Sequence, residues 1–324
     1  MKDVRRYSPR TQELYRRALE DFARWAVIAG TSQVMTSTVM PCLSAGHLIP
    51  SRMREYEAHL IEEGKSARTV HLNMSALSGL CAWLVKKGRL KSNPAKAVKR
   101  PKMEKRLPEY CTQKAMDEYL AESSHAAGEE ELRILQSSAP GSKMATELYR
   151  RRLRRLIVLL LYTTGIRRAE LLGLRVGSID RERGTLRVLG KGDKMREIPL
   201  IASTNQEISL YLQAVESMEG KERHSGDFLL VTEKGRPLYP QYVERAVKEE
   251  LGGANIPGKK SPHVLRHSLA TALLDEGVDL NAIKEMLGHA NLAATEVYTH
   301  NSIERLKAQY INAHPRAKNE ESHD

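Results

Sequence analysis

Residues 156–171 of this 324-residue chain are LIVLLLYTTGIRRAEL, an apolar run that ends in two threonines, a glycine and two arginines. A helical pattern covers about 144–163, so the run predicts an apolar helix that stops at Gly165. A second helix then begins with Arg167 in its first turn, and Glu170 either caps that start or holds Arg167 in place. Free N–H groups beside a guanidinium make a place for an anion. For this motif alone, an ordinary helix corner with surface arginines is the better interpretation.

The chain around this corner mixes helices with a few short strands. Three β-leaning runs, at 176–179, 185–189 and 196–200, are separated by turn-forming residues and predict a small antiparallel sheet. Residues 122–143 are expected to form a flexible or partly helical insertion. Further helices are predicted at about 113–123, 144–163, 204–218, 240–251, 262–276, 280–287 and 302–312. The fold class is therefore mainly α with a small antiparallel β-sheet.

The N-terminal third is predicted to be helical and to form a separate domain. Helical patterns cover about 9–30, 50–63 and 66–87. A basic stretch poor in apolar residues follows, and we place the domain boundary at its end. The two domains are 1–106, with a basic linker at about 91–106, and 107–324.

Positive charge is divided unequally between these domains. The chain has 52 Lys and Arg against 40 Asp and Glu, a formal charge of +12, and the whole excess lies in residues 1–106. On charge alone, a nucleic-acid contact and a solvated basic linker are about equally good interpretations. The cationic residues that would make a nucleic-acid contact, and that are our DNA-binding candidates, are Lys86, Lys87, Lys96, Lys99, Arg100, Lys102, Lys105 and Arg106.

Composition excludes several classes of protein. Apolar residues make up 41% of the chain, which rules out a disordered protein. The longest apolar stretch, 156–166, is too short to span a membrane, and the first residues do not resemble a signal peptide, so we expect a cytoplasmic protein without membrane contact. The three cysteines, Cys42, Cys81 and Cys111, lack the spacing of a disulfide framework or a zinc site.

A second cationic motif, SPHVLRH, occupies 261–267. It predicts a helix whose first turn is capped by Ser261. His263 and Arg266 are three residues apart and share one face of that helix, while His267 either joins them or turns to the core. Two histidines and an arginine at a helix start form an anion-binding cluster that is harder to explain by packing than a lone histidine.

Two loop motifs complete the set of candidates. Lys191 lies between two glycines at the tip of a predicted hairpin, where a loop can approach a ligand closely, although a solvated lysine is the better interpretation in isolation. His289 follows Gly288, which is expected to end a helix. Tyr298 lies nearby in sequence, and such a tyrosine is usually only a half-buried aromatic.

Taken together, these residues suit one reaction. Two guanidiniums, a lysine and two imidazoles match a phosphodiester that passes through a pentavalent, more negative transition state. Tyr298 would be the nucleophile and Lys191 would protonate the leaving 5′ oxygen. No acidic pair and no His or Cys cluster accompanies them, and no Walker A motif occurs, so we expect no metal and no other cofactor. The candidate catalytic residues are Arg167, Lys191, His263, Arg266, His289 and Tyr298.

In this order, the motifs resemble those of the tyrosine recombinase (phage integrase) family, and in particular the bacterial Xer-type recombinases. The matching motifs are TGxRxxEL at 164–171, GKG at 190–192, HxLRHS at 263–268, LGH at 287–289 and YTH at 298–300. Five ordered motifs are a specific signal, and shorter matches extend over most of the chain.

The resemblance implies a fold, residue roles and an assembly. A SAM-like four-helix core-binding domain and a catalytic domain of the DNA breaking-rejoining fold would close around double-stranded DNA as a clamp. Arg167 and Arg266 would grip the scissile phosphate, and Tyr298 would form a 3′-phosphotyrosyl intermediate. His263 and His289 would hydrogen-bond the phosphate oxygens and assist proton transfer, and Glu170 and His267 would be supporting residues. The helix at about 302–312 would dock into a neighbouring protomer of a tetramer, which is homomeric or contains a second recombinase.

The implied function is site-specific DNA recombination by metal-independent transesterification. It would serve chromosome or plasmid dimer resolution, and so chromosome partition at cell division, or the integration or excision of a mobile element. One alternative is a type IB topoisomerase-like enzyme, against which the Xer-like flanks argue. Another is a non-catalytic DNA-binding relative with an accessory or regulatory role, which should have lost some of the six catalytic residues.

Overall fold

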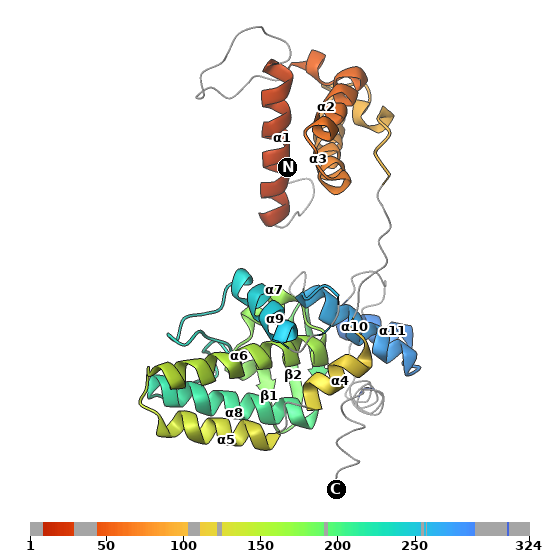
Figure 1. The fold of residues 1–324 in the computed structure, drawn as a ribbon. Helices are drawn as coiled ribbons and strands as arrows, with labels where there is room; N and C mark the ends of the chain where they lie inside the picture. Colours follow the sequence, from red (N-terminus) through yellow and green to blue (C-terminus); the bar gives the residue numbers. More distant parts are fainter. Residues whose placement is uncertain are drawn as a thin grey trace. The chain divides into compact units, whose positions relative to one another are not determined.

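The computed structural model describes residues 9–28, 44–102, 111–121, 125–190, 194–253, 256, 258–288 and 310. The chain forms two compact units, Met1–Leu107 and Pro108–Asp324 (Figure 1). Helices predominate in both units, and a single three-stranded sheet lies in the second unit among the described residues. The predicted fold class, mainly α with a small antiparallel sheet, is confirmed.

The described part of the N-terminal unit contains three helices and two short 3-10 turns. They are α1 (Pro9–Ile28), η1 (Ala45–His47), α2 (Pro50–Glu62), α3 (Ala67–Lys86) and η2 (Pro94–Ala97). The core is built from one face of each helix, with Phe22, Tyr56 and Met74 fully buried in it. Ser66 caps α3 by accepting a hydrogen bond from the Thr69 N–H, as expected of a serine at a helix start.

Part of the predicted linker is packed against α3. Asn93 caps η2 by accepting the Ala95 N–H (3.1 Å), and its amide donates to the Ser78 carbonyl (3.0 Å). Ala95 and Val98 are buried in the core of the unit. The His71 ring contacts the Pro101 carbonyl at 2.8 Å. Residues 93–101 are therefore held by the N-terminal unit rather than strung between units.

The C-terminal unit is organised around one long buried helix. Its elements are α4 (Gln113–Ala121), α5 (His125–Ser137), α6 (Lys143–Thr164), α7 (Arg168–Gly173), η3 (Val176–Ser178), β1 (Ile179–Asp180), β2 (Thr185–Leu189), β3 (Met195–Pro199), α8 (Ala202–Glu219), α9 (Pro240–Gly253), α10 (Pro262–Asp275) and α11 (Leu280–Leu287). Helix α6 packs against α5, α8, α9 and α10. Every residue from 156 to 164 is buried, as expected for a helix that is apolar all round.

The sheet is antiparallel in the order β1-β2-β3, with Leu186 opposite Ile198 on its buried face. The first predicted strand, 176–179, begins instead as the 3-10 turn η3, because the Gly177 and Val176 N–H groups bond to backbone carbonyls of the 225–227 loop rather than to a strand. Strand β3 contacts α11, and β2 contacts α7. The sheet thus brings the hairpin beside α7, which follows Arg167 and contains Glu170, and beside α11, after which His289 follows in the sequence.

The insertion predicted at 122–143 contains the helix α5. This helix packs against α6 and α8. A buried ion pair lies between the three helices: the Arg152 guanidinium lies 3.4 Å from the Glu207 carboxylate and also donates to the Gly128 carbonyl. Both side chains of the ion pair are almost fully buried. Helix α5 is therefore a folded layer of the C-terminal unit.

The predicted helix at 302–312 lies outside the described residues except for Tyr310. Tyr310 is buried in this chain's own core, and its hydroxyl donates to the Thr163 carbonyl near the end of α6. Docking of this segment onto a neighbouring protomer stays a prediction.

Candidate active site

The corner between α6 and α7 is shaped by Gly165. This residue ends α6 with φ near +60°, a conformation that side chains disfavour. A Cβ atom here would lie 2.5 Å from Leu287 Cδ2 and 3.0 Å from Leu269 Cδ2. Glycine therefore serves both the turn and the close approach of α10 and α11.

Arg167 lies at the N-cap position of α7, immediately after this corner. Its backbone N–H and its Nη1 both donate to the Glu170 carboxylate, each at 2.8 Å, and its Nη2 donates to the Gly288 carbonyl at 2.7 Å. Glu170 therefore caps the helix and also holds the arginine, so the two interpretations left open by the sequence are both correct. About a third of the Arg167 side chain stays exposed.

Arg266 reaches the same place from α10. Its Nη1 donates to the Gly165 carbonyl (2.5 Å) and its Nη2 to the Leu287 carbonyl (2.6 Å). Both acceptors are carbonyls left without partners where α6 and α11 end, and such groups are satisfied well by a cation. Arg266 is buried.

A third arginine, Arg196 on β3, belongs to the site and was not among the predicted residues. Its two terminal nitrogens donate to the two oxygens of Glu170 at 3.0 and 2.8 Å, and its Nε donates to the Met286 carbonyl at 2.9 Å. A lone cation on a short strand directly after the lysine loop was the available sequence signal. We call Arg167, Glu170, Arg196 and Arg266 the arginine cluster.

The charges of the arginine cluster are not balanced. Arg167 and Arg196 share the Glu170 carboxylate, and the hydrogen-bond partners of Arg266 among the described residues are backbone carbonyls at the ends of α6 and α11. Burial and the neighbouring Arg167 lower the pKa of Arg266 to about 10. Burial alone would raise the pKa of Glu170, but hydrogen bonds from Arg196 and Arg167 outweigh it and lower that pKa overall. The cluster therefore retains positive charge that an anion would stabilise.

The remaining predicted site residues fall into two groups. His263 and His267 lie on α10 with exposed side chains, so His267 does not turn to the core. Ser261 stands at the N-cap position of α10, but its hydroxyl makes no capping bond. Lys191, His289 and Tyr298 lie outside the described residues, although the structure describes the neighbours Gly190 and Gly288 of the first two.

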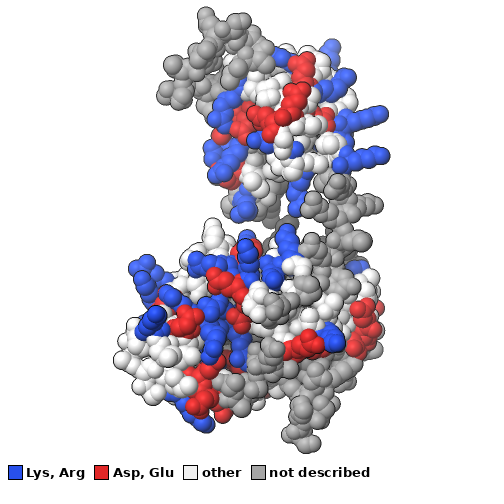
Figure 2. Space-filling model, viewed as in Figure 1, with Lys and Arg blue, Asp and Glu red and all other residues white. Residues whose placement is uncertain are grey.

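The predicted DNA-binding residues lie in the N-terminal unit and do not belong to the arginine cluster. Lys86, Lys87, Lys96, Lys99, Arg100 and Lys102 are all exposed, whereas Lys105 and Arg106 lie outside the described residues. Figure 2 shows Lys and Arg side chains projecting from the edge of this unit. Arg100 donates to the Ser75 hydroxyl at 2.9 Å. This surface, residues 86–102, is called the basic surface below.

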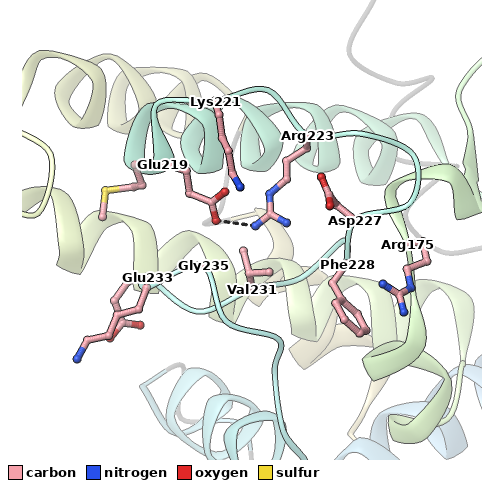
Figure 3. Close-up of a pocket in the computed structure, with 11 residues that line it drawn as sticks. Arg175, Glu219, Lys221, Arg223, Asp227, Phe228, Val231, Glu233 and Gly235 are labelled. Atoms are coloured by element: carbon pink, nitrogen blue, oxygen red, sulfur yellow. Dashed lines mark hydrogen bonds and ion pairs between the residues drawn. The ribbon is translucent and has the colours of Figure 1, made fainter.

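A separate polar hollow of roughly 730 Å³ lies between the end of α8 and the segment 221–235 (Figure 3). Its acidic side chains already have partners: Glu219 accepts from Arg223 Nη2 at 2.6 Å, and Glu233 accepts from Arg150 Nη2 at 2.6 Å. None of the predicted site residues lines it.

The described ranges contain neither a metal-binding cluster nor a membrane-spanning helix. Among those residues, no three His, Cys, Asp or Glu side chains gather so that they could hold a metal ion. No helix in the same part of the chain is long and apolar enough to cross a membrane.

Known proteins resemble both units of the chain. Residues 128–305 match the model of the phage integrase family, and residues 1–88 match the model of the phage integrase N-terminal SAM-like domain. The tyrosine recombinase XerC of Mycobacterium sp. (strain KMS) is 35% identical over 278 residues, which cover 86% of each chain. That of Bacillus subtilis (strain 168) is 33% identical over 261 residues, covering 79% of this chain and 78% of the relative.

Solved structures agree with these matches. The XerH site-specific recombinase bound to its difH substrate, in a pre-cleavage complex, is 26% identical with a TM-score of 0.60, covering 91% of this chain and 77% of that one. The integrase of transposon Tn1549, in complex with transposon right end DNA, has a TM-score of 0.61 at 17% identity, covers 93% of this chain and 94% of that one, and shares the fold. With its two domains matched in order, the chain belongs to the phage integrase family and is a tyrosine-type site-specific recombinase.

Proposed function

We propose that this recombinase binds double-stranded DNA at a specific site and cleaves and rejoins its strands by transesterification, without a metal or a nucleotide. The observation that carries the proposal is the arginine cluster, in which three guanidiniums from three elements converge with one carboxylate. A phosphodiester brings one negative charge and its pentavalent transition state brings more. The surplus charge of the cluster is therefore satisfied best in the transition state, which is the condition for catalysis.

The proposed reaction assigns the remaining roles to residues of the matching motifs. The Tyr298 hydroxyl attacks the phosphorus, the bond to the 5′ oxygen breaks, and a 3′-phosphotyrosyl bond replaces it. Lys191 gives a proton to the leaving 5′ oxygen. His263 and His289 hydrogen-bond the phosphate and assist proton transfer, and one of them accepts the proton that the Tyr298 hydroxyl releases. The reverse steps rejoin a strand, so the energy of the original bond is conserved and no nucleotide is consumed.

The basic surface is proposed to hold the duplex. Its exposed cations would neutralise backbone phosphates, which positions a protein on DNA without selecting a sequence. Complexes of the XerH recombinase with difH substrate support DNA as the partner. We propose further that protomers assemble as a tetramer on two sites, and that the reaction serves dimer resolution or the movement of a mobile element in the cytoplasm.

The proposal is tested with DNA sites selected by the protein itself. The Tyr298→Phe variant is used to enrich bound duplexes from a randomised pool, and the enriched duplex is rebuilt with a nick close to the cleavage position. Wild type should form a covalent protein–DNA adduct on this suicide duplex with EDTA present. Tyr298→Phe should form none while it binds the same duplex with unchanged affinity.

The opposite outcome favours the other functional class. Specific binding without any adduct on the selected duplexes would overturn the catalytic proposal and leave an accessory DNA-binding protein. An adduct that persists in Tyr298→Phe would show that another residue is the nucleophile. An adduct that requires a divalent metal would contradict the metal-independent mechanism.

A further inference from the structure

The guanidinium of Arg196 lies at the centre of the arginine cluster rather than at its open side. Its three nitrogens donate to both oxygens of Glu170 and to the Met286 carbonyl. The side chain is 9% exposed. Arg167, by comparison, is 34% exposed. Arg196 therefore faces the protein, whereas Arg167 retains donors toward solvent.

Two glycines lie close to this guanidinium. They belong to the two chain segments that continue into the predicted catalytic residues Lys191 and His289. A Cβ atom on Gly190 would lie 3.2 Å from Arg196 Nη1, and one on Gly288 would lie 3.2 Å from the same nitrogen. Gly190 immediately precedes Lys191, and Gly288 immediately precedes His289. The position of Arg196 thus sets the spacing between the two backbone segments at the points where those residues begin.

Three arginines bind the end of α11 in register. Arg196 donates to the carbonyl of Met286, Arg266 to that of Leu287, and Arg167 to that of Gly288. These are the carbonyls that a helix leaves without intrahelical partners, and they carry the negative end of its dipole. The end of α11 therefore fixes three cations side by side against their mutual repulsion.

Arg196 also limits how many hydrogen bonds Glu170 can accept from the Arg167 guanidinium. Glu170 Oε1 accepts from both Arg167 Nη1 and Arg196 Nη1, and Oε2 accepts from Arg196 Nη2 and from the Arg167 backbone N–H. Without Arg196, each carboxylate oxygen would keep one bond from Arg167, and the group could turn toward a two-bond fork with the Arg167 guanidinium, which is the preferred geometry of such a pair. That fork would draw Arg167 away from a bound phosphate.

We propose that Arg196 is a positioning residue that holds Glu170 and the end of α11 so that Arg167 and Arg266 present their free donors to a phosphate. The inference rests on the proposed cleavage of DNA but concerns a residue that does not itself contact DNA. It requires the geometry of a guanidinium, because a lysine has one nitrogen and cannot bond Glu170 in a fork and Met286 at once.

The test compares Arg196→Gln and Arg196→Lys with the matched control Arg187→Gln. Arg187 lies on the neighbouring strand β2 and makes its ion pairs with Glu197 and Asp180, outside the cluster. Each variant is assayed as the folded full chain for duplex affinity and for single-turnover adduct formation at saturating DNA. Both Arg196 variants should cleave about 10- to 100-fold more slowly, as for other residues that orient a functional group, with affinity changed less than threefold. The control should match wild type.

A purely structural role would give a different pattern. In Arg196→Gln the buried Glu170 loses a cationic partner, so the acid limb of the rate profile should move to higher pH, which general loosening of the fold would not cause. Cleavage by both Arg196 variants at the wild-type rate, or full rescue by Arg196→Lys, would overturn the inference.

A second measurement separates this inference from the proposed function. Inorganic phosphate is titrated into the DNA-free protein and followed by phosphorus NMR. Weaker phosphate binding in Arg196→Gln than in Arg187→Gln supports the positioning role even if wild type forms no adduct on any duplex. Equal phosphate binding in the two variants overturns it, whatever the duplex assays show.

Discussion

The two units of this protein use positive charge in opposite ways. The basic surface of the N-terminal unit spreads exposed cations over residues 86–102, most of them with no acidic partner nearby. The arginine cluster gathers three guanidiniums into one largely buried network with one carboxylate and four backbone carbonyls. Exposed charge is screened by salt and tolerates movement, whereas buried charge depends on geometry.

Net charge therefore identifies the unit that bears the basic surface, but it does not identify the unit that contains the arginine cluster. The excess of +12 lies wholly in residues 1–106, whereas residues 107–324 are neutral overall. The C-terminal unit nonetheless holds the more demanding cationic site, because its cations converge by folding rather than by number. Substitutions in the cluster should therefore act through rate and stability, and those on the basic surface through affinity and salt dependence.

The largest expected effect is a difference in the rate of adduct formation between variants of two adjacent arginines, Arg167 and Arg168. Arg167→Gln removes a donor of the cluster and should slow adduct formation by about 10²- to 10³-fold, as for removal of one transition-state donor. Arg168→Gln removes a residue that pairs with Glu244 on α9 instead, and should cleave within a few-fold of wild type. Single-turnover kinetics on the suicide duplex measure both. Equal losses would mean that the charge of the motif matters rather than the cluster.

The next effect concerns the corner that places the cluster. Gly165→Ala should lower the free energy of unfolding by about 3 kcal/mol, through about 1 kcal/mol of left-handed backbone strain and about 2 kcal/mol of overpacking against Leu287 and Leu269. Gly220→Ala is the matched control: Gly220 ends α8 at φ near +68° but has open space around it. It should lose only the strain. Urea unfolding gives both values, and equal losses would contradict the close approach.

A smaller effect follows from the carboxylate of the cluster. The folded-state pKa of Glu170 is lowered, so its contribution to stability is complete above its unfolded pKa and is lost as pH falls through the folded value. Glu170→Gln should be less stable than wild type by about 1–3 kcal/mol at pH 7, and the gap should shrink below about pH 4. Glu13→Gln, which breaks exposed ion pairs of α1, should leave stability nearly unchanged. Thermal unfolding across pH provides the comparison, and a constant gap would show that ionisation of Glu170 is irrelevant.

The smallest effect per residue is expected on the basic surface. Lys96→Gln or Lys99→Gln should each reduce the slope of log affinity against log salt by about 0.9 and weaken binding less than tenfold, with no change in melting temperature. Lys114→Gln, on the exposed side of α4, serves as the control. Filter binding over a series of salt concentrations measures the slopes. Slopes equal to wild type would mean that these lysines are only solvated.

The corner of the site was predictable from the sequence because its contacts are local. The apolar run, the glycine and Glu170 three residues after Arg167 all follow rules of helix ends. Arg196 was not predictable, because its partners lie 26 and 90 residues away in the chain and a five-residue strand gives no periodic signal for them. The packing of 93–101 was missed for a related reason. This basic stretch has few apolar residues, of which Ala95 and Val98 join the core, and its hydrogen bonds are made with α3.

The three successive carbonyls at the end of α11 make the arginine cluster dependent on complete folding of the C-terminal unit. The arginines that bind them come from the start of α7, from β3 and from α10, and Arg266 also needs the end of α6. A nascent or partly unfolded chain lacks at least one of these elements and therefore has no complete arginine cluster. Under the proposed mechanism, such a chain cannot cleave DNA until its C-terminal unit has finished folding.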